Sequence, residues 1–147
     1  MYLLDTQQVM DLFSRDAARP IFRWLDETKP GQNDLFVSVL SLGQLAHAIE
    51  HMAVAPRNHW RRLYQEGRRS LDEAGSVIDV DAGIVDVWQS DLRGGRLSDI
   101  ADADEELGED DRLIFATAIA RGYTLVTQGS RLLEQIAERT TLTVTEL

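Results

Sequence analysis

Two acidic residues that lie far apart in the sequence each occupy the junction between a predicted strand and a predicted helix. Asp5 directly follows the apolar run Tyr2–Leu4, and Asp111, with Asp110 beside it, opens an apolar segment of helical character. In open parallel sheets, ligands bind beyond the carboxyl ends of the strands, so Asp5 and Asp111 can converge there. Converging carboxylates indicate a hard divalent cation such as Mg²⁺ or Mn²⁺.

If both side chains ligate one cation, we expect their carboxylates to lie within roughly 4–7 Å of each other. A purely structural interpretation stays open, because an aspartate at the start of a helix accepts hydrogen bonds from free N–H groups and its charge is favoured by the helix dipole. For Asp81, which begins another helical pattern, capping is the preferred interpretation. His47 and His51 lie one helical turn apart and form a possible metal pair, but they have no obvious third ligand.

These residues must be positioned by a chain in which strands and helices alternate. Predicted strands cover residues 2–4, 35–39, 77–80, 124–126 and 142–144. Predicted helices cover residues 7–13, 20–28, 41–52, 57–74, 82–93, 111–121 and 131–137; Gly122 is placed to end the sixth, and Ser130 to cap the seventh. This order predicts an α/β fold, a three-layer α/β/α sandwich with a mainly parallel central sheet, in a single domain over residues 1–147.

Gln44 lies near the start of the third predicted helix. The run Ser41-Leu42-Gly43-Gln44 fits the capping-box pattern, in which glutamine at the third helical position reaches back to the N–H group of the cap residue. Glutamine cannot supply a negative charge, although its carbonyl oxygen can ligate a hard cation weakly.

The composition limits the possible chemistry. A chain of 147 residues, 44% of them hydrophobic, can bury a core as one domain. It has no cysteine, which excludes disulfides, thiolate metal sites and cysteine nucleophiles. No segment approaches the roughly 18 apolar residues of a membrane span. We therefore expect a cytoplasmic protein with no membrane contact.

The net charge of −10 opposes nucleic-acid binding through overall electrostatics. The charge is uneven, however, because residues 99–111 are strongly acidic and residues 57–69 are rich in arginine. A solvated helix face explains the arginines. A flexible solvated loop explains the acids of residues 96–108, which can alternatively substitute for missing metal ligands.

Several segments resemble the PIN-domain nucleases, and in particular the VapC-like toxins of VapBC toxin–antitoxin pairs. The matching residues are Tyr2-Leu3-Leu4-Asp5-Thr6, Phe36 to Leu45, and Asp111 to Ala118 with Tyr123 to Thr127. They occur in the family's order over nearly the whole chain.

The resemblance implies a hydrolase, an endoribonuclease that cleaves RNA phosphodiester bonds with Mg²⁺ or Mn²⁺. It makes Asp5 and Asp111 the expected catalytic residues and metal ligands, with Gln44 as a weakened third member and Asp110 as a further metal ligand. The family's site normally has four acidic positions. The helix-borne glutamate falls here on Gln44, and the acid or amide two residues after the strand-end threonine falls on Gly129.

Three functions stay open: an active endoribonuclease toxin, a degenerate PIN module that binds an antitoxin, RNA or itself without cleavage, and an unrelated α/β binding protein whose acids are helix caps. In the first two, Thr6 and Thr127 can orient carboxylates or hold a water. The resemblance also implies a cognate antitoxin and a homodimer as partners. Phe22 and Trp24 on the early helices can serve these contacts if they are exposed, with burial in the core as the default.

Overall fold

The computed structural model describes residues 1–93, 97–100 and 107–147. Its strands are β1 (Tyr2–Leu4), β2 (Leu35–Ser38), β3 (Val77–Ile78), β4 (Thr124–Thr127) and β5 (Thr143–Glu146). Its helices are α1 (Thr6–Ser14), α2 (Pro20–Thr28), α3 (Val39–Glu50), α4 (Val54–Glu73), α5 (Ala82–Val87), the π-helical turn η1 (Trp88–Leu92), α7 (Glu109–Arg121) and α8 (Arg131–Arg139). At least one helix separates each pair of successive strands, as the sequence predicts.

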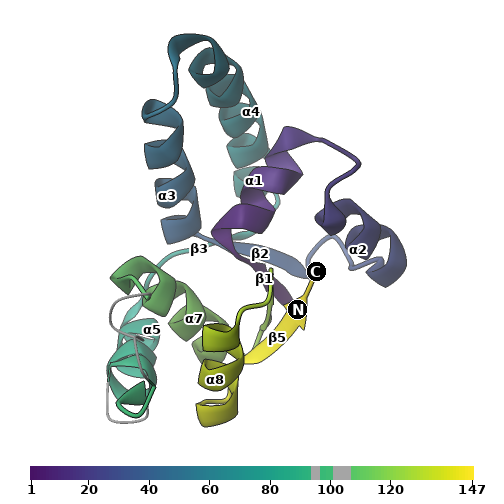
Figure 1. The fold of residues 1–147 in the computed structure, drawn as a ribbon. Coiled ribbons are helices and arrows are strands. Elements are labelled where there is room, and N and C mark those ends of the chain that lie inside the picture. Colours follow the sequence, from purple (N-terminus) through teal and green to yellow (C-terminus); the bar gives the residue numbers. More distant parts are fainter. Residues whose placement is uncertain (94–96, 101–106) are drawn as a thin grey trace.

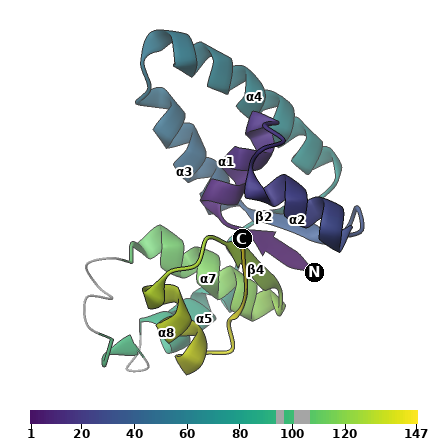
Figure 2. The same ribbon diagram turned by 45° about the vertical axis from the view of Figure 1, so that its right-hand side comes forward.

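The five strands form one parallel sheet in the order β3-β2-β1-β4-β5. The first strand is central, and its Leu3 pairs with Phe36 of β2 and with Leu125 of β4. Because all strands run in the same direction, their carboxyl ends share one edge of the sheet. The C-terminus of the chain follows β5 at this edge, and Figure 2 shows it beside the arrowhead of β1.

Helices cover both faces of the sheet (Figure 1). Helices α1 to α4 lie on one face, and α5, α7 and α8 lie on the other. Neighbouring residues of β1 serve both layers, because side chains alternate between the faces of a strand. Leu3 is buried in the core with α5, α7 and α8, whereas Leu4 is buried in the core with α1, α2 and α3. The predicted α/β/α sandwich is therefore confirmed.

The start of α3 differs from the prediction and changes the local role of Gln44. Strand β2 ends at Ser38, whose Oγ accepts a hydrogen bond from the N–H group of Leu40 at 3.2 Å. Ser38 is the cap because its backbone is extended, whereas Ser41 is already helical and buried. The helix thus begins at Val39, and Gln44 lies in its second turn. The capping-box interpretation of Gln44 is wrong.

Other helix ends follow the predicted capping chemistry. Asp81 Oδ1 accepts a hydrogen bond from the N–H group of Ile84 at 3.0 Å and caps α5. Gly122 ends α7 in the left-handed region with φ of 66°, which glycine adopts without a Cβ penalty. Ser130 caps α8 through the N–H group of Leu133 at 3.1 Å. These three local predictions are confirmed.

The predicted acidic loop over residues 96–108 falls largely outside the described residues, so its flexibility stays a prediction. Its described ends add Leu97, Ile100 and Leu107 to the core beside α5, α7 and α8. Asp99 forms an ion pair with Arg139 at 3.1 Å. Within the described ranges, no helix has the length and apolar character needed to cross a bilayer.

Candidate functional site

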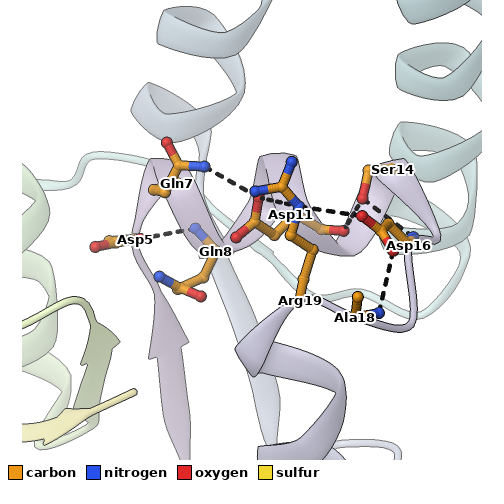
Figure 3. Close-up of polar contacts among 8 residues, drawn as sticks. All are labelled: Asp5, Gln7, Gln8, Asp11, Ser14, Asp16, Ala18 and Arg19. Carbon is orange, nitrogen blue, oxygen red and sulfur yellow. Dashed lines mark hydrogen bonds and ion pairs between the residues drawn. The ribbon is translucent and has the colours of Figure 1, made fainter.

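Asp5 lies where β1 ends and α1 begins, and both of its carboxylate oxygens accept hydrogen bonds. Oδ1 accepts from the N–H group of Gln8 at 2.9 Å, which caps the helix (Figure 3). Oδ2 accepts from the hydroxyl of Thr127, which ends the neighbouring strand β4. Asp5 is therefore a helix cap, and a side chain at a second strand end fixes its direction.

Burial raises the pKa of the Asp5 carboxyl above its usual value. Hydrogen bonds from Thr127 and from the N–H groups of Gln8 and Gln7 oppose that increase, and the negative charge of Asp111 adds to it. Asp111 thus lies close enough to Asp5 for their charges to repel. The expected carboxylate separation stays a prediction.

Gln44 contacts Asp111 and Thr6, the residue that follows Asp5. Its Oε1 accepts a hydrogen bond from the hydroxyl of Thr6, the first residue of α1. Its Nε2 donates to Oδ1 of Asp111 at 3.4 Å, across 67 positions of sequence. The structure therefore brings residues from α1, α3 and α7 together at the carboxyl edge of the sheet.

Asp111 is not the cap of its helix. The cap position of α7 is Gly108, which has no side chain to accept a hydrogen bond, and Asp111 is the third residue of the helix. The helix dipole still favours an acid in this first turn, but capping does not account for the contact of Asp111 with Gln44.

The other acids of the first turn of α7 have different surroundings. Glu109 accepts a hydrogen bond from Nε1 of Trp88 at 3.0 Å and pairs with Arg93 at 3.2 Å. Asp110 is exposed, and its side chain leaves the helix about 100° from that of Asp111 because an α-helix has 3.6 residues per turn. Its role as a metal ligand stays a prediction.

Glu146, at the end of β5, is an acid beside Gly129 that is not among the residues predicted from the sequence. A Cβ atom added to Gly129 would lie 2.6 Å from Oε1 of Glu146, and nearer still to Oε2 and the carboxyl carbon. The predicted last strand stopped at residue 144, so this acid stood outside every predicted element. An acid two residues beyond the closing strand was the only sequence signal for it.

Several other sequence candidates make contacts within the fold, away from Asp5 and Asp111. The imidazoles of His47 and His51 pack against each other with centroids 4.3 Å apart, and Nδ1 of His51 lies 2.9 Å from the carbonyl oxygen of His47. In the arginine-rich helix α4, Arg61 pairs with Glu50 at 2.6 Å. Asp81, besides capping α5, pairs with Arg121 at 2.7 Å.

The two aromatic residues of α2 differ in exposure. Trp24 is 9% exposed and packs edge-on against Tyr2, with ring centroids 5.0 Å apart. Phe22 is half-buried beside the same core. The default of a core position is therefore confirmed for Trp24, and only Phe22 retains surface for a partner.

An open pocket that Asp111 helps to line lies between the N-terminal halves of α7 and α8. Its wall is mainly apolar, and the lining includes Leu107, Phe115, Ser130, Leu132, Leu133 and Ile136. The site therefore has a polar part around Asp5, Gln44 and Asp111 and an adjoining apolar hollow.

Comparison with known protein families matches residues 2–139 to the PIN domain. The chain belongs to the PIN domain family. PIN domains are in general metal-dependent nucleases. The matched segment contains Asp5, Gln44, Asp111 and Gly129, whereas Glu146 lies beyond its end. No curated protein matches the sequence.

Solved structures share this PIN fold at low sequence identity. FitAcB from Neisseria gonorrhoeae is 18% identical with a TM-score of 0.68, covering 99% of this chain and 97% of that one. DNA-bound VapBC from Salmonella typhimurium is 17% identical with a TM-score of 0.68, over 99% and 96% of the chains. VapBC-5 from Mycobacterium tuberculosis, of the VapBC family of toxin–antitoxin systems, is 16% identical with a TM-score of 0.65, over 99% and 97%.

The residues of this PIN domain suit the divalent cation that the family uses. Asp5 and Asp111 offer hard oxygen donors. The carbonyl of Gln44 is a third such donor if its amide turns, because its nitrogen now faces Asp111 and its oxygen accepts from Thr6. Gln8, whose backbone N–H group donates to Asp5, is 1% exposed. Neither Nε2 nor Oε1 of its side chain has a hydrogen-bond partner in the described residues. Buried side-chain amides in folded proteins normally have such partners, so Gln8 is an exception at this end of α1.

As the side chains stand, no three Asp, Glu, His or Cys residues in the described part of the chain are grouped to hold a metal ion. The donor set therefore depends on the Gln44 amide or on an acid that moves toward Asp5 and Asp111.

Proposed function

We propose that this protein is the toxin of a toxin–antitoxin pair and a metal-dependent endoribonuclease with a weakened acidic site. The observation that carries the proposal is the contact of Gln44 with Asp111 and with Thr6, the residue that follows Asp5, at the carboxyl edge of the sheet. PIN family membership supplies the reaction class, hydrolysis of a phosphodiester bond in RNA, with Mg²⁺ or Mn²⁺ as the cation.

In this proposal Asp5 and Asp111 hold the cation, with the Gln44 carbonyl as a weak third donor and Asp110 as a neighbouring acid. When bound, the cation lowers the pKa of a water molecule and offsets the charge that develops on the phosphate oxygens. Thr127 holds the Asp5 carboxylate in one direction, and Thr6 holds the Gln44 amide. Because Gln44 is neutral, we expect weaker metal binding than in a site with four acids.

An antitoxin is the proposed partner, because the fold is that of proteins solved as VapBC and FitAcB. Self-association as a homodimer is proposed on the same basis, and the half-buried Phe22 on α2 is a residue that either contact can cover. With an RNA substrate and an antitoxin as partners, the proposed place of action is the cytoplasm.

A second function has an observation of its own. The Gln44 amide already satisfies Asp111 with a hydrogen bond, so this part of the site needs no cation to hold it together. The alternative is a PIN module that has lost cleavage and acts by binding its antitoxin, RNA or a second copy of itself.

Cleavage of RNA by the purified protein in Mg²⁺ and in Mn²⁺ separates the two. We expect slow cleavage that EDTA stops and that Asp5→Asn and Asp111→Asn abolish. Asp81→Asn, which removes a carboxylate at the start of α5, is the matched control and should cleave like the wild type. If metal-dependent cleavage survives both site substitutions, the cleavage comes from a contaminant. No cleavage by the wild-type protein or by Gln44→Glu would favour the binding module.

A further inference from the structure

The space beside Gly129 is filled by a carboxylate from another strand. Gly129 is two residues beyond β4, and a Cβ atom there would lie 2.6 Å from Oε1 of Glu146 and closer to the rest of its carboxyl group. No ordinary contact of a Cβ atom is that short, so a side chain at position 129 and the Glu146 carboxylate in this position exclude each other.

The register of the sheet explains why Glu146 reaches this position. Strands β4 and β5 are parallel, with Thr127 paired to Glu146, and the N–H group of Leu147 donates to the carbonyl oxygen of Thr127 at 3.0 Å. Paired residues of neighbouring parallel strands direct their side chains to the same face. The Thr127 hydroxyl donates to Asp5 from that face, so Glu146 emerges on the side of the sheet where Asp5 is held.

The Glu146 carboxylate is available for a ligand. The residue is exposed, and its side chain makes no hydrogen bond or ion pair within the described parts of the chain. Three rotatable bonds separate its carboxyl group from Cα, so the carboxylate can move by several ångströms while β5 stays paired. This freedom matters, because in the present arrangement the described acids do not yet form a three-carboxylate group.

We infer that Glu146 supplies, from the last strand, the carboxylate that Gly129 does not, and joins Asp5 and Asp111 as a ligand of the divalent cation. This inference rests on the proposed function. It assigns the third negative charge of the site to an acid outside the segment that matches the PIN family. Gln44 then adds a neutral donor to these three carboxylates.

Calorimetric titration of the RNA-free protein with Mn²⁺ tests the inference directly. We expect Glu146→Gln to weaken Mn²⁺ binding by about tenfold or more, the scale on which loss of a supporting group weakens a metal site. Glu138→Gln is the matched control, because it removes the same charge from an exposed carboxylate on α8 that pairs with Arg139 at 3.7 Å. Its affinity for Mn²⁺ should equal that of the wild type.

The remaining outcomes separate this inference from the function beneath it. If Glu146→Gln binds Mn²⁺ like the wild type while Asp5→Asn does not bind, Glu146 is not a ligand and the metal site stands without it. If the wild-type protein does not bind Mn²⁺, the metal site and the role of Glu146 fall together.

Position 129 offers a second test that uses the same titration. In Gly129→Asp the new side chain displaces only the flexible end of Glu146, so the fold should persist. The introduced acid takes over the role of Glu146, and Glu146→Gln in that background should change Mn²⁺ affinity by less than about twofold. An equal loss of affinity in both backgrounds would mean that the two positions are independent, which contradicts the inference.

Discussion

The amide nitrogen of Gln44 donates a hydrogen bond to Oδ1 of Asp111 at 3.4 Å. A carboxylate in the place of this amide would repel Asp111. The amide oxygen accepts from the Thr6 hydroxyl, so the side chain is held at both ends. In a site built of carboxylates, a cation or a proton must offset repulsion between neighbours. Here the glutamine removes one of those repulsions without a cation.

Gln44→Glu should make the stability of the protein depend on metal. The new carboxylate faces Asp111 and loses the hydrogen bond, so we expect the melting temperature in EDTA to fall by roughly 2–4 °C, the change that ~1 kcal/mol produces in a chain of this size. Saturating Mn²⁺ should reverse this loss of stability. The substitution itself should raise Mn²⁺ affinity and RNA cleavage above those of the wild type. Thermal melts with and without Mn²⁺ measure this.

Gln44→Met is the control for that change, because it has a similar length and no charge. It should lose the hydrogen bonds without gaining a dependence on Mn²⁺. If Gln44→Glu has the same melting temperature and metal affinity as the wild type, then Gln44 lies outside the metal site and another acid completes it.

Asp5→Asn should stabilise the metal-free protein at neutral pH. Burial raises the pKa of Asp5 in the folded state, so its favourable contribution is present below the unfolded-state pKa and is lost as the pH rises through the folded-state pKa. Asparagine carries no charge to desolvate and can still accept the hydrogen bond that caps α1. We therefore expect Asp5→Asn to melt higher than the wild type at about pH 7, with a smaller difference at about pH 4.

Melting curves of both proteins in EDTA across this pH range provide the measurement. With Mn²⁺ present the order should reverse, because the cation binds the wild-type carboxylate and stabilises only that protein. A difference between the two proteins that does not change with pH would show that the charge of Asp5 has no cost in the folded state.

The two aromatic residues of α2 should separate stability from partner binding. Trp24 is 9% exposed and packs against Tyr2, so Trp24→Ala should lower the free energy of unfolding by about 3–5 kcal/mol. Phe22 is half-buried, so Phe22→Ala should cost less, and it should weaken association with the antitoxin or a second copy. Urea denaturation and sedimentation with the co-expressed product of the neighbouring gene measure the two effects. Unchanged association of Phe22→Ala would place the contact elsewhere.

Local signals in the sequence determined the succession of elements and several of their ends. Capping by Asp5, Asp81 and Ser130 and the left-handed Gly122 depend on residues within four positions, so a linear pattern is sufficient to predict them. The same local reasoning failed at Gln44, because Ser38 competes with Ser41 for the cap and only the extended backbone of β2 decides between them.

The content of the site was decided by the tertiary structure. Thr127 donates to Asp5 across 122 positions and Gln44 donates to Asp111 across 67, so neither contact leaves a periodic trace in the sequence. The approach of Glu146 to Gly129 depends on the pairing of β5 with β4, a register that is set by the whole sheet. The sequence placed two acids at strand and helix ends. The parallel sheet brings the carboxyl ends of its strands to one edge, and this determined which other side chains lie beside those acids.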